Sequence, residues 1–233
     1  RLKPINIKAD LDRAGEFRSI REINNEIRRL NLASYAPLRY VLPHRQAAYD
    51  KKYSTEIRGG EGFFRQADRE ERLIHLLRGN VLKRMEGAVP SFALTVQRQL
   101  RDVEATLARI ESHAEEMEEI DIEDVDLDDP AFESLLVGRK VKVLLKDVDL
   151  IRWKQELIED RNRLATLHAA AAQVDASRDA KLTALREMIE HKCRNPINPG
   201  NRKVIVFTAF ADTARYLYDQ LAPWAKTTLG IDT

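Results

Sequence analysis

The residues that could bind a metal or act as nucleophiles are few and scattered. Cys193 is the single cysteine among 233 residues, and the nearest histidine, His191, stands two positions before it. Two ligands without a second pair do not make a zinc site. The other histidines are His44, His75, His113 and His168, and none has a serine or cysteine at a spacing that suggests nucleophilic catalysis. We therefore predict no metal centre and no catalytic residue in this chain.

The sequence also lacks the motifs of nucleotide hydrolysis. It contains no G-x-x-x-x-G-K-[ST] loop to hold nucleotide phosphates and no Asp-Glu-x-His box to hold Mg²⁺. We expect neither ATPase activity nor a bound cofactor from these 233 residues.

Basic side chains offer a different chemistry, the binding of a nucleic-acid backbone. Six of them lie within twenty residues around a predicted helix: Arg65, Arg69, Arg72, Arg78, Lys83 and Arg84. Phosphate contacts of this kind give salt-sensitive binding without sequence preference. A solvated helix face would have a similar composition, so both interpretations stay open for these residues.

Thr208 and Phe210 form a second candidate site. They lie where a predicted buried strand meets the start of a helix, and a helix N-terminus suits a phosphate oxygen. The alternative is an ordinary strand end with Phe210 in the core.

The elements that would position these residues are mostly helices. Apolar residues recur at alternating spacings of four and three from Val96 to Met117 and again from Leu150 to Val174, where Asp160 is the one polar member. Such seams are typical of coiled helices, and we expect an antiparallel hairpin of residues 91–120 against 149–174. Asp160 is expected to fix the register or face a basic partner, and Trp153 to lie in the core.

The pattern changes near the C-terminus. Val204-Ile205-Val206-Phe207 is a run of β-branched and aromatic residues followed by an amphipathic helix. A strand that is apolar on both faces needs neighbouring strands, because buried main-chain groups must be paired. We therefore expect one β-α unit of a truncated α/β lobe, and a chain that is a piece of a longer protein.

Two phrases carry a family resemblance. Residues 202–217, beginning Arg202-Lys203-Val204-Ile205-Val206-Phe207-Thr208-Ala209-Phe210, resemble the entry to the second RecA-like lobe of Swi/Snf-type superfamily-two helicases, and Lys203 to Phe210 is similar to helicase motif IV. Leu76 to Glu86 is similar to the inter-lobe helix of bacterial members. The two phrases stand in the family's order, with a long helical insertion between them.

The resemblance implies a fragment of an ATP-driven translocase acting on double-stranded DNA. ATP and Mg²⁺ would belong to the parent chain, and the remaining helicase lobes would be partners of this piece. We expect a mainly α fold in three parts: an inter-lobe helical segment (1–90), the antiparallel hairpin (91–175) and the start of the second lobe (176–233). The expected nucleic-acid-binding residues are Arg78, Lys83, Arg84, Thr208 and Phe210.

Composition adds limits. Charged residues make up 33% of the chain and aromatic residues 6%, which favours long helices. No apolar run is long enough for a membrane span, and one cysteine allows no internal disulfide, so a cytoplasmic protein is expected. Residues 115–129 hold ten acids and no base. This acidic run suits a solvated linker, and the alternative is an intramolecular mimic of nucleic acid.

A different class of function is also open. The hairpin would then be a protein-interaction arm that forms a homodimer through its exposed apolar edge and does not bind DNA.

Overall fold

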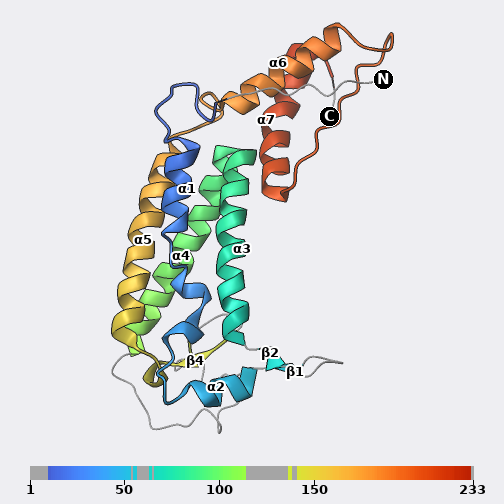
Figure 1. Cartoon of the computed structure of the whole chain (residues 1–233). Coiled ribbons are helices and arrows are strands. Elements are labelled where there is room, and N and C mark those ends of the chain that lie inside the picture. The colour runs from blue at the N-terminus through green and yellow to red at the C-terminus, as the bar shows by residue number, and fades with distance from the viewer. Residues whose placement is uncertain are drawn as a thin grey trace. The chain divides into compact units, whose positions relative to one another are not determined.

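A computed structural model describes residues 10–53, 55–56, 63–64, 66–113, 136–137 and 141–231. The fold is mainly helical, as expected (Figure 1). The α-helices are α1 (Ile20–Arg28), α2 (Gln46–Tyr53), α3 (Gln66–Gly87), α4 (Val89–His113), α5 (Leu150–Ala172), α6 (Ala180–Arg194) and α7 (Ala211–Leu229). The acidic run 115–129 and Arg65 lie outside the described residues.

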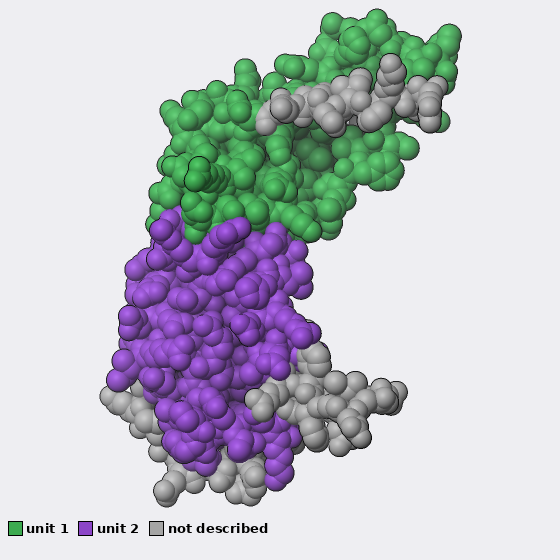
Figure 2. Space-filling model, in the orientation of Figure 1, with its two compact units in different colours: residues 1–25, 81–96, 166–233 green, residues 26–80, 97–165 purple. Residues whose placement is uncertain are grey.

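The chain divides into two compact units (Figure 2). Unit 1 comprises residues 1–25, 81–96 and 166–233, and unit 2 comprises residues 26–80 and 97–165. Each unit is assembled from separated stretches of sequence. The segment boundaries expected near residues 90 and 175 both fall within unit 1.

Short strands complete the described structure. β1 (Thr55–Glu56) pairs antiparallel with β2 (Phe63–Phe64), and β3 (Leu136–Val137) pairs antiparallel with β4 (Val143–Leu144).

Unit 2 is built around a buried connector, residues 30–41. It contains two short 3-10 helices, Ala33–Tyr35 and Pro37–Tyr40. Its apolar members are almost entirely buried: Leu30, Leu32, Ala33, Ala36, Leu38, Tyr40 and Val41. Because such a segment lacks a regular hydrogen-bond ladder, its main-chain groups must find side-chain partners.

Most described members of the two apolar seams are buried, Leu100 and Leu150 are half-buried, and Ala114 and Met117 lie outside the described residues. On α4, Val96, Val103, Leu107 and Ile110 are each less than a tenth exposed. On the second seam the buried residues are Trp153, Leu157, Leu164, Leu167, Ala171 and Val174. The periodicity thus predicted the buried faces correctly. The pairing of these helices as an antiparallel hairpin stays a prediction.

Trp153 lies in the core, as expected. It is fully buried, its indole N–H donates to the Ala33 carbonyl at 3.0 Å, and its ring stacks on Tyr40 with 5.4 Å between centroids. This aromatic pair fixes α5 against the connector within unit 2.

In unit 1 the expected strand at residues 204–207 is not formed. The chain is irregular there, and Ile205 and Phe207 are 77% and 89% exposed, while Val204 and Val206 are both 40% exposed. None of the hydrogen bonds found among the described residues uses the main chain of these four residues. A lone strand has no neighbour with which to pair, which explains the difference from the expectation.

A buried pair of hydroxyl groups links two helix starts in unit 1. α4 begins at Val89, and the buried Ser91 hydroxyl accepts a hydrogen bond from the Thr213 hydroxyl at 3.1 Å. This contact joins the start of α4 to the start of α7 within unit 1.

Candidate functional site

Of the expected nucleic-acid contacts, Arg84 and Phe210 come together in unit 1. The Arg84 guanidinium lies 4.6 Å from the centroid of the Phe210 ring, and its Nη1 donates to Asp212 at 2.7 Å. Phe210 is the N-cap residue of α7 and makes no side-chain cap. The cation–π contact and the ion pair hold the end of α3 against the start of α7.

Neighbouring groups strengthen this junction. Lys181 Nζ donates to the Glu86 carbonyl, and a methyl group at Gly87 would meet Thr213 Oγ1 at 3.4 Å. This is an ordinary van der Waals distance, so the end of α3 packs beside Thr213 without requiring glycine at position 87.

Lys83 and Thr208 lie in the same unit with exposed side chains. The Thr208 hydroxyl accepts from the Phe210 N–H at 3.5 Å, and this long contact leaves the hydroxyl accessible. Lys83 has no hydrogen bond or ion pair among the described residues. Of the expected contact residues on α3 (Arg78, Lys83 and Arg84), Lys83 is the one for which no interaction is found in the described structure.

Arg78 has a different role, in unit 2. Its Nε and Nη2 donate to the Leu30 carbonyl at 3.1 and 2.6 Å, just after α1 ends. Burial lowers the pKa of this guanidinium. An arginine held in this way has fewer donors left for a phosphate, and its main effect is to satisfy a buried carbonyl.

Two buried carboxyl groups in unit 2, those of Asp160 and Glu70, accept hydrogen bonds from main-chain N–H groups of the connector. Asp160 is fully buried, and its oxygens accept from the Asn31 N–H at 2.6 Å and the Ala33 N–H at 2.8 Å. Between them Leu32 has a positive φ of 54°, so the two N–H groups converge on one carboxyl group. Burial raises the pKa of Asp160 to about 6, against the effect of the N–H donors.

Among the described residues, the hydrogen-bond partners found for Asp160 are main-chain N–H groups of the connector, and its charge also interacts with the Arg78 guanidinium. The sequence marked it as an odd acid in an apolar seam, but its hydrogen-bond partners lie more than 120 positions away, where no local signal indicates them.

Glu70 is the second buried acid, and sequence reasoning missed it. It is 2% exposed, and Oε2 accepts from the Leu38 N–H at 3.1 Å. Oε1 has no partner among the described residues. Burial raises the pKa of Glu70 to about 8. Its sequence neighbours Arg69, Glu71 and Arg72 are all charged, so the sequence suggested that Glu70 is exposed as well.

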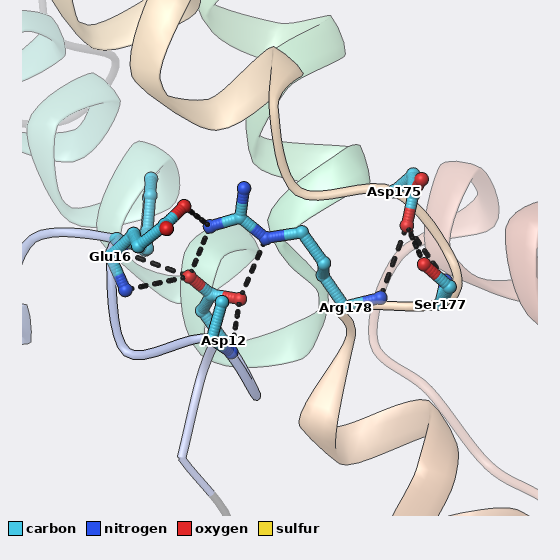
Figure 3. A network of polar contacts seen from close by, with 7 residues as sticks. Asp12, Glu16, Asp175, Ser177 and Arg178 are labelled. Carbon is cyan, nitrogen blue, oxygen red and sulfur yellow. Dashed lines mark hydrogen bonds and ion pairs between the residues drawn. The ribbon is translucent and has the colours of Figure 1, made fainter.

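A third polar network fixes the start of unit 1 (Figure 3). Asp12 accepts from Arg178 Nε at 3.0 Å and from the N–H groups of Ala14, Glu16 and Phe17 at 2.9–3.0 Å. Arg178 Nη2 also lies 3.0 Å from Glu16. The residue after Arg178, Asp179, caps α6 through the Lys181 and Leu182 N–H groups and accepts from the Tyr216 hydroxyl of α7 at 2.8 Å.

A cavity of about 640 Å³ lies between α6, the 202–206 segment and α7. Its lining is largely apolar and includes Ile189, Val204, Val206, Leu221 and Trp224. Val204, Ile205 and Val206 all line this cavity, although Ile205 is 77% exposed against 40% for each of the two valines. Phe207, which is 89% exposed, is not among the lining residues.

No group of three or more potential metal ligands gathers within the described ranges. Within those ranges, too, no helix is both long and apolar enough to cross a bilayer. Comparisons with protein-family models, with curated proteins and with solved structures found no significant match to this chain.

Proposed function

We propose that this chain is a non-catalytic helical part of a cytoplasmic Swi/Snf-like ATP-dependent DNA translocase. In this role it couples the two motor lobes and contacts the backbone of duplex DNA. The proposal combines the two sequence phrases, Leu76 to Glu86 and Lys203 to Phe210, with the surface that the chain presents around the second phrase.

The observation that carries the proposal is the exposed apolar segment Val204–Phe207. Val204, Ile205 and Val206 line the cavity beside α6 and α7, Ile205 and Phe207 are 77% and 89% exposed, and the main-chain groups of the segment are unpaired among the described residues. A partner that completes this segment must supply neighbouring strands and an apolar layer over Ile205 and Phe207. A RecA-like lobe supplies both.

A second copy of the chain could supply a neighbouring strand, but it could not supply the apolar layer. A twofold axis that pairs two identical strands antiparallel runs perpendicular to the sheet and keeps each face on its own side. The α6–α7 layers of both copies would then lie on one face, and Phe207 of both copies would stay exposed. A different partner therefore fits the segment better than self-pairing does.

The alternative function, a dimerising coiled-coil arm, has less support. It requires an exposed apolar edge on the hairpin, whereas most described seam residues of α4 and α5 are buried within this chain.

The DNA contact is tested by fluorescence anisotropy of a labelled duplex at several salt concentrations. We expect binding near 50 mM salt that weakens steeply as salt rises, and a several-fold lower affinity for Lys83→Glu. Arg101→Glu is the matched control, because Arg101 is also exposed and unengaged within the described structure but lies on α4. An equal loss in both variants would show that net charge, not a contact at Lys83, governs binding.

A further inference from the structure

The outer edge of β4 is covered by two tyrosine side chains of α2. The hydroxyl groups of Tyr49 and Tyr53 bind main-chain groups of Leu144 and Lys142. Successive strand residues direct their N–H and C=O groups to opposite edges. Val143 therefore faces β3, its partner strand, while Lys142 and Leu144 face α2. All these residues belong to unit 2, and in this unit α2 takes the place of a third strand.

Each hydroxyl group reproduces part of a strand contact. The Tyr53 hydroxyl accepts from the Lys142 N–H at 3.0 Å and donates to the Lys142 carbonyl at 2.8 Å. An opposing strand residue would make the same two bonds. The Tyr49 hydroxyl accepts from the Leu144 N–H at 2.9 Å and donates to the buried Asp147 carboxylate at 2.9 Å. Asp147 thus turns a lone pair of the Tyr49 hydroxyl toward the strand.

The spacing of the two tyrosines matches the spacing of the strand. Residues four apart on a helix are separated by about 6 Å along its axis, and residues two apart on a strand by about 6.6 Å. The two tyrosine rings stack with 6.4 Å between their centroids. One turn of α2 therefore reaches both Lys142 and Leu144.

α2 buries little of its own surface. Of its eight described residues, Tyr49 is the one that is buried. Just before the helix, Arg45 Nε donates to Asp147 at 2.9 Å. A helix this short is not stable by itself in water, and a segment with few buried apolar contacts opens locally. We therefore expect α2 to leave the strand edge without unfolding of the rest of unit 2.

We propose that α2 is an autoinhibitory cover, whose tyrosine hydroxyls keep the outer edge of β4 from pairing with the same edge of a second copy of the chain. The edge is complementary to itself. In an antiparallel pair centred on Val143, each Lys142 lies opposite Leu144 of the other copy, so like charges do not face each other.

Self-pairing at this edge needs only main-chain partners. The side chains of Val143 and Leu144 are already buried within one chain, so a second copy has no apolar layer to supply. This distinguishes the β4 edge from the Val204–Phe207 segment. An unprotected strand edge is a ready template for pairing between chains, which is the reaction that α2 holds back.

Two double variants separate the contact at the edge from a general loss of hydroxyl groups. Tyr49→Phe/Tyr53→Phe keeps both rings and removes the two hydroxyl groups from the edge. Tyr35→Phe/Tyr40→Phe is the matched control, because it removes two hydroxyl groups of the same unit that donate to carboxylates instead of to a strand.

Both variants are made in a reference chain that carries Ile205→Lys and Phe207→Lys, so that association through the Val204–Phe207 segment does not contribute. Sedimentation over a range of concentrations gives the dimer dissociation constant. We expect this constant to be about tenfold lower for Tyr49→Phe/Tyr53→Phe than for the reference chain, because the hydrogen bonds that compete with pairing are lost. The control should leave it unchanged.

Amide hydrogen exchange in the reference chain tests the opening of the cover without any tyrosine variant. The amides of Lys142 and Leu144 should exchange together with those of α2, and about tenfold faster than the buried amides of α5.

A Tyr49→Phe/Tyr53→Phe variant that remains monomeric would show that α2 does not hold back self-pairing, and the inference would be wrong. Equal dimerisation of the control would assign the effect to general destabilisation. Exchange of Lys142 and Leu144 only together with α5 would show that the cover does not open. If the double variant does not fold, Tyr53→Phe alone is compared with Tyr35→Phe, since both positions are half-buried.

Discussion

Ionisation of the Glu70 carboxyl group is expected to have the largest effect on how the stability of the fold depends on pH. Its pKa of about 8 lies above the ordinary value of 4.5 because the side chain is buried. The folded state therefore holds the proton more tightly than the unfolded state does. The unfolding free energy should fall as the pH rises from about 4.5 to about 8 and stay level above that.

Glu70→Gln keeps a neutral acceptor for the Leu38 N–H and cannot ionise. Near pH 5 the variant should match the wild-type chain, and near pH 9 it should be more stable by about 2–4 kcal/mol. Urea unfolding at both pH values measures this difference. Glu71→Gln, at the exposed neighbouring position, should show no such pH-dependent gain. A Glu70→Gln variant less stable than wild type at pH 9 would mean that the ionised carboxylate stabilises the fold.

At the scale of elements, the Asp12–Arg178 ion pair clamps the loop before α1 to the turn before α6. The Arg178 guanidinium holds the pKa of Asp12 well below its ordinary value, aided by three N–H donors. Because the folded pKa is depressed, this contribution is present above the unfolded pKa near 3.8 and is lost as the pH falls below it.

Asp12→Asn should therefore lower the unfolding free energy at pH 7 by about 2 kcal/mol, since a charge-assisted hydrogen-bond set is weakened. The loss should shrink as the pH falls below 4. Asp10→Asn, two positions earlier and exposed, should leave stability unchanged at every pH. Chemical denaturation across this pH range provides the measurement, and equal effects of the two variants would show that the clamp contributes nothing.

The elements also show which features the sequence could predict. Spacing of apolar residues predicted most helices and the buried faces of α4 and α5, because burial on a helix follows a local period. It could not predict that the connector 30–41 is buried, since its main chain is satisfied by Asp160 and Glu70 from distant helices. Likewise, Arg78 was expected on a surface, because no local signal indicates that it binds the Leu30 carbonyl, 48 positions away. Val204–Phe207 has the composition of a buried strand, but strand formation depends on neighbours that the described chain does not supply.

At the scale of the whole molecule, the uncovered apolar segment should drive association between chains when no other partner is present. Replacing both Ile205 and Phe207 by Lys should reduce concentration-dependent association in light scattering. The thermal midpoint should stay nearly constant, because both side chains are largely exposed. Replacing the exposed Ile151 of α5, 84% exposed, by Lys is the control. Equal relief of association by the control would assign the association to general surface hydrophobicity.

The central claim is that this helical chain contacts the sugar-phosphate backbone of duplex DNA. The salt dependence of binding tests it most directly. Anisotropy titrations of the wild-type chain with two duplexes of unrelated sequence would be made from about 50 to 200 mM salt. The account predicts the same affinity for both sequences and a linear fall of log K with log salt, with a slope of about −0.9 for each phosphate neutralised. No binding of either duplex at the lowest salt would contradict it.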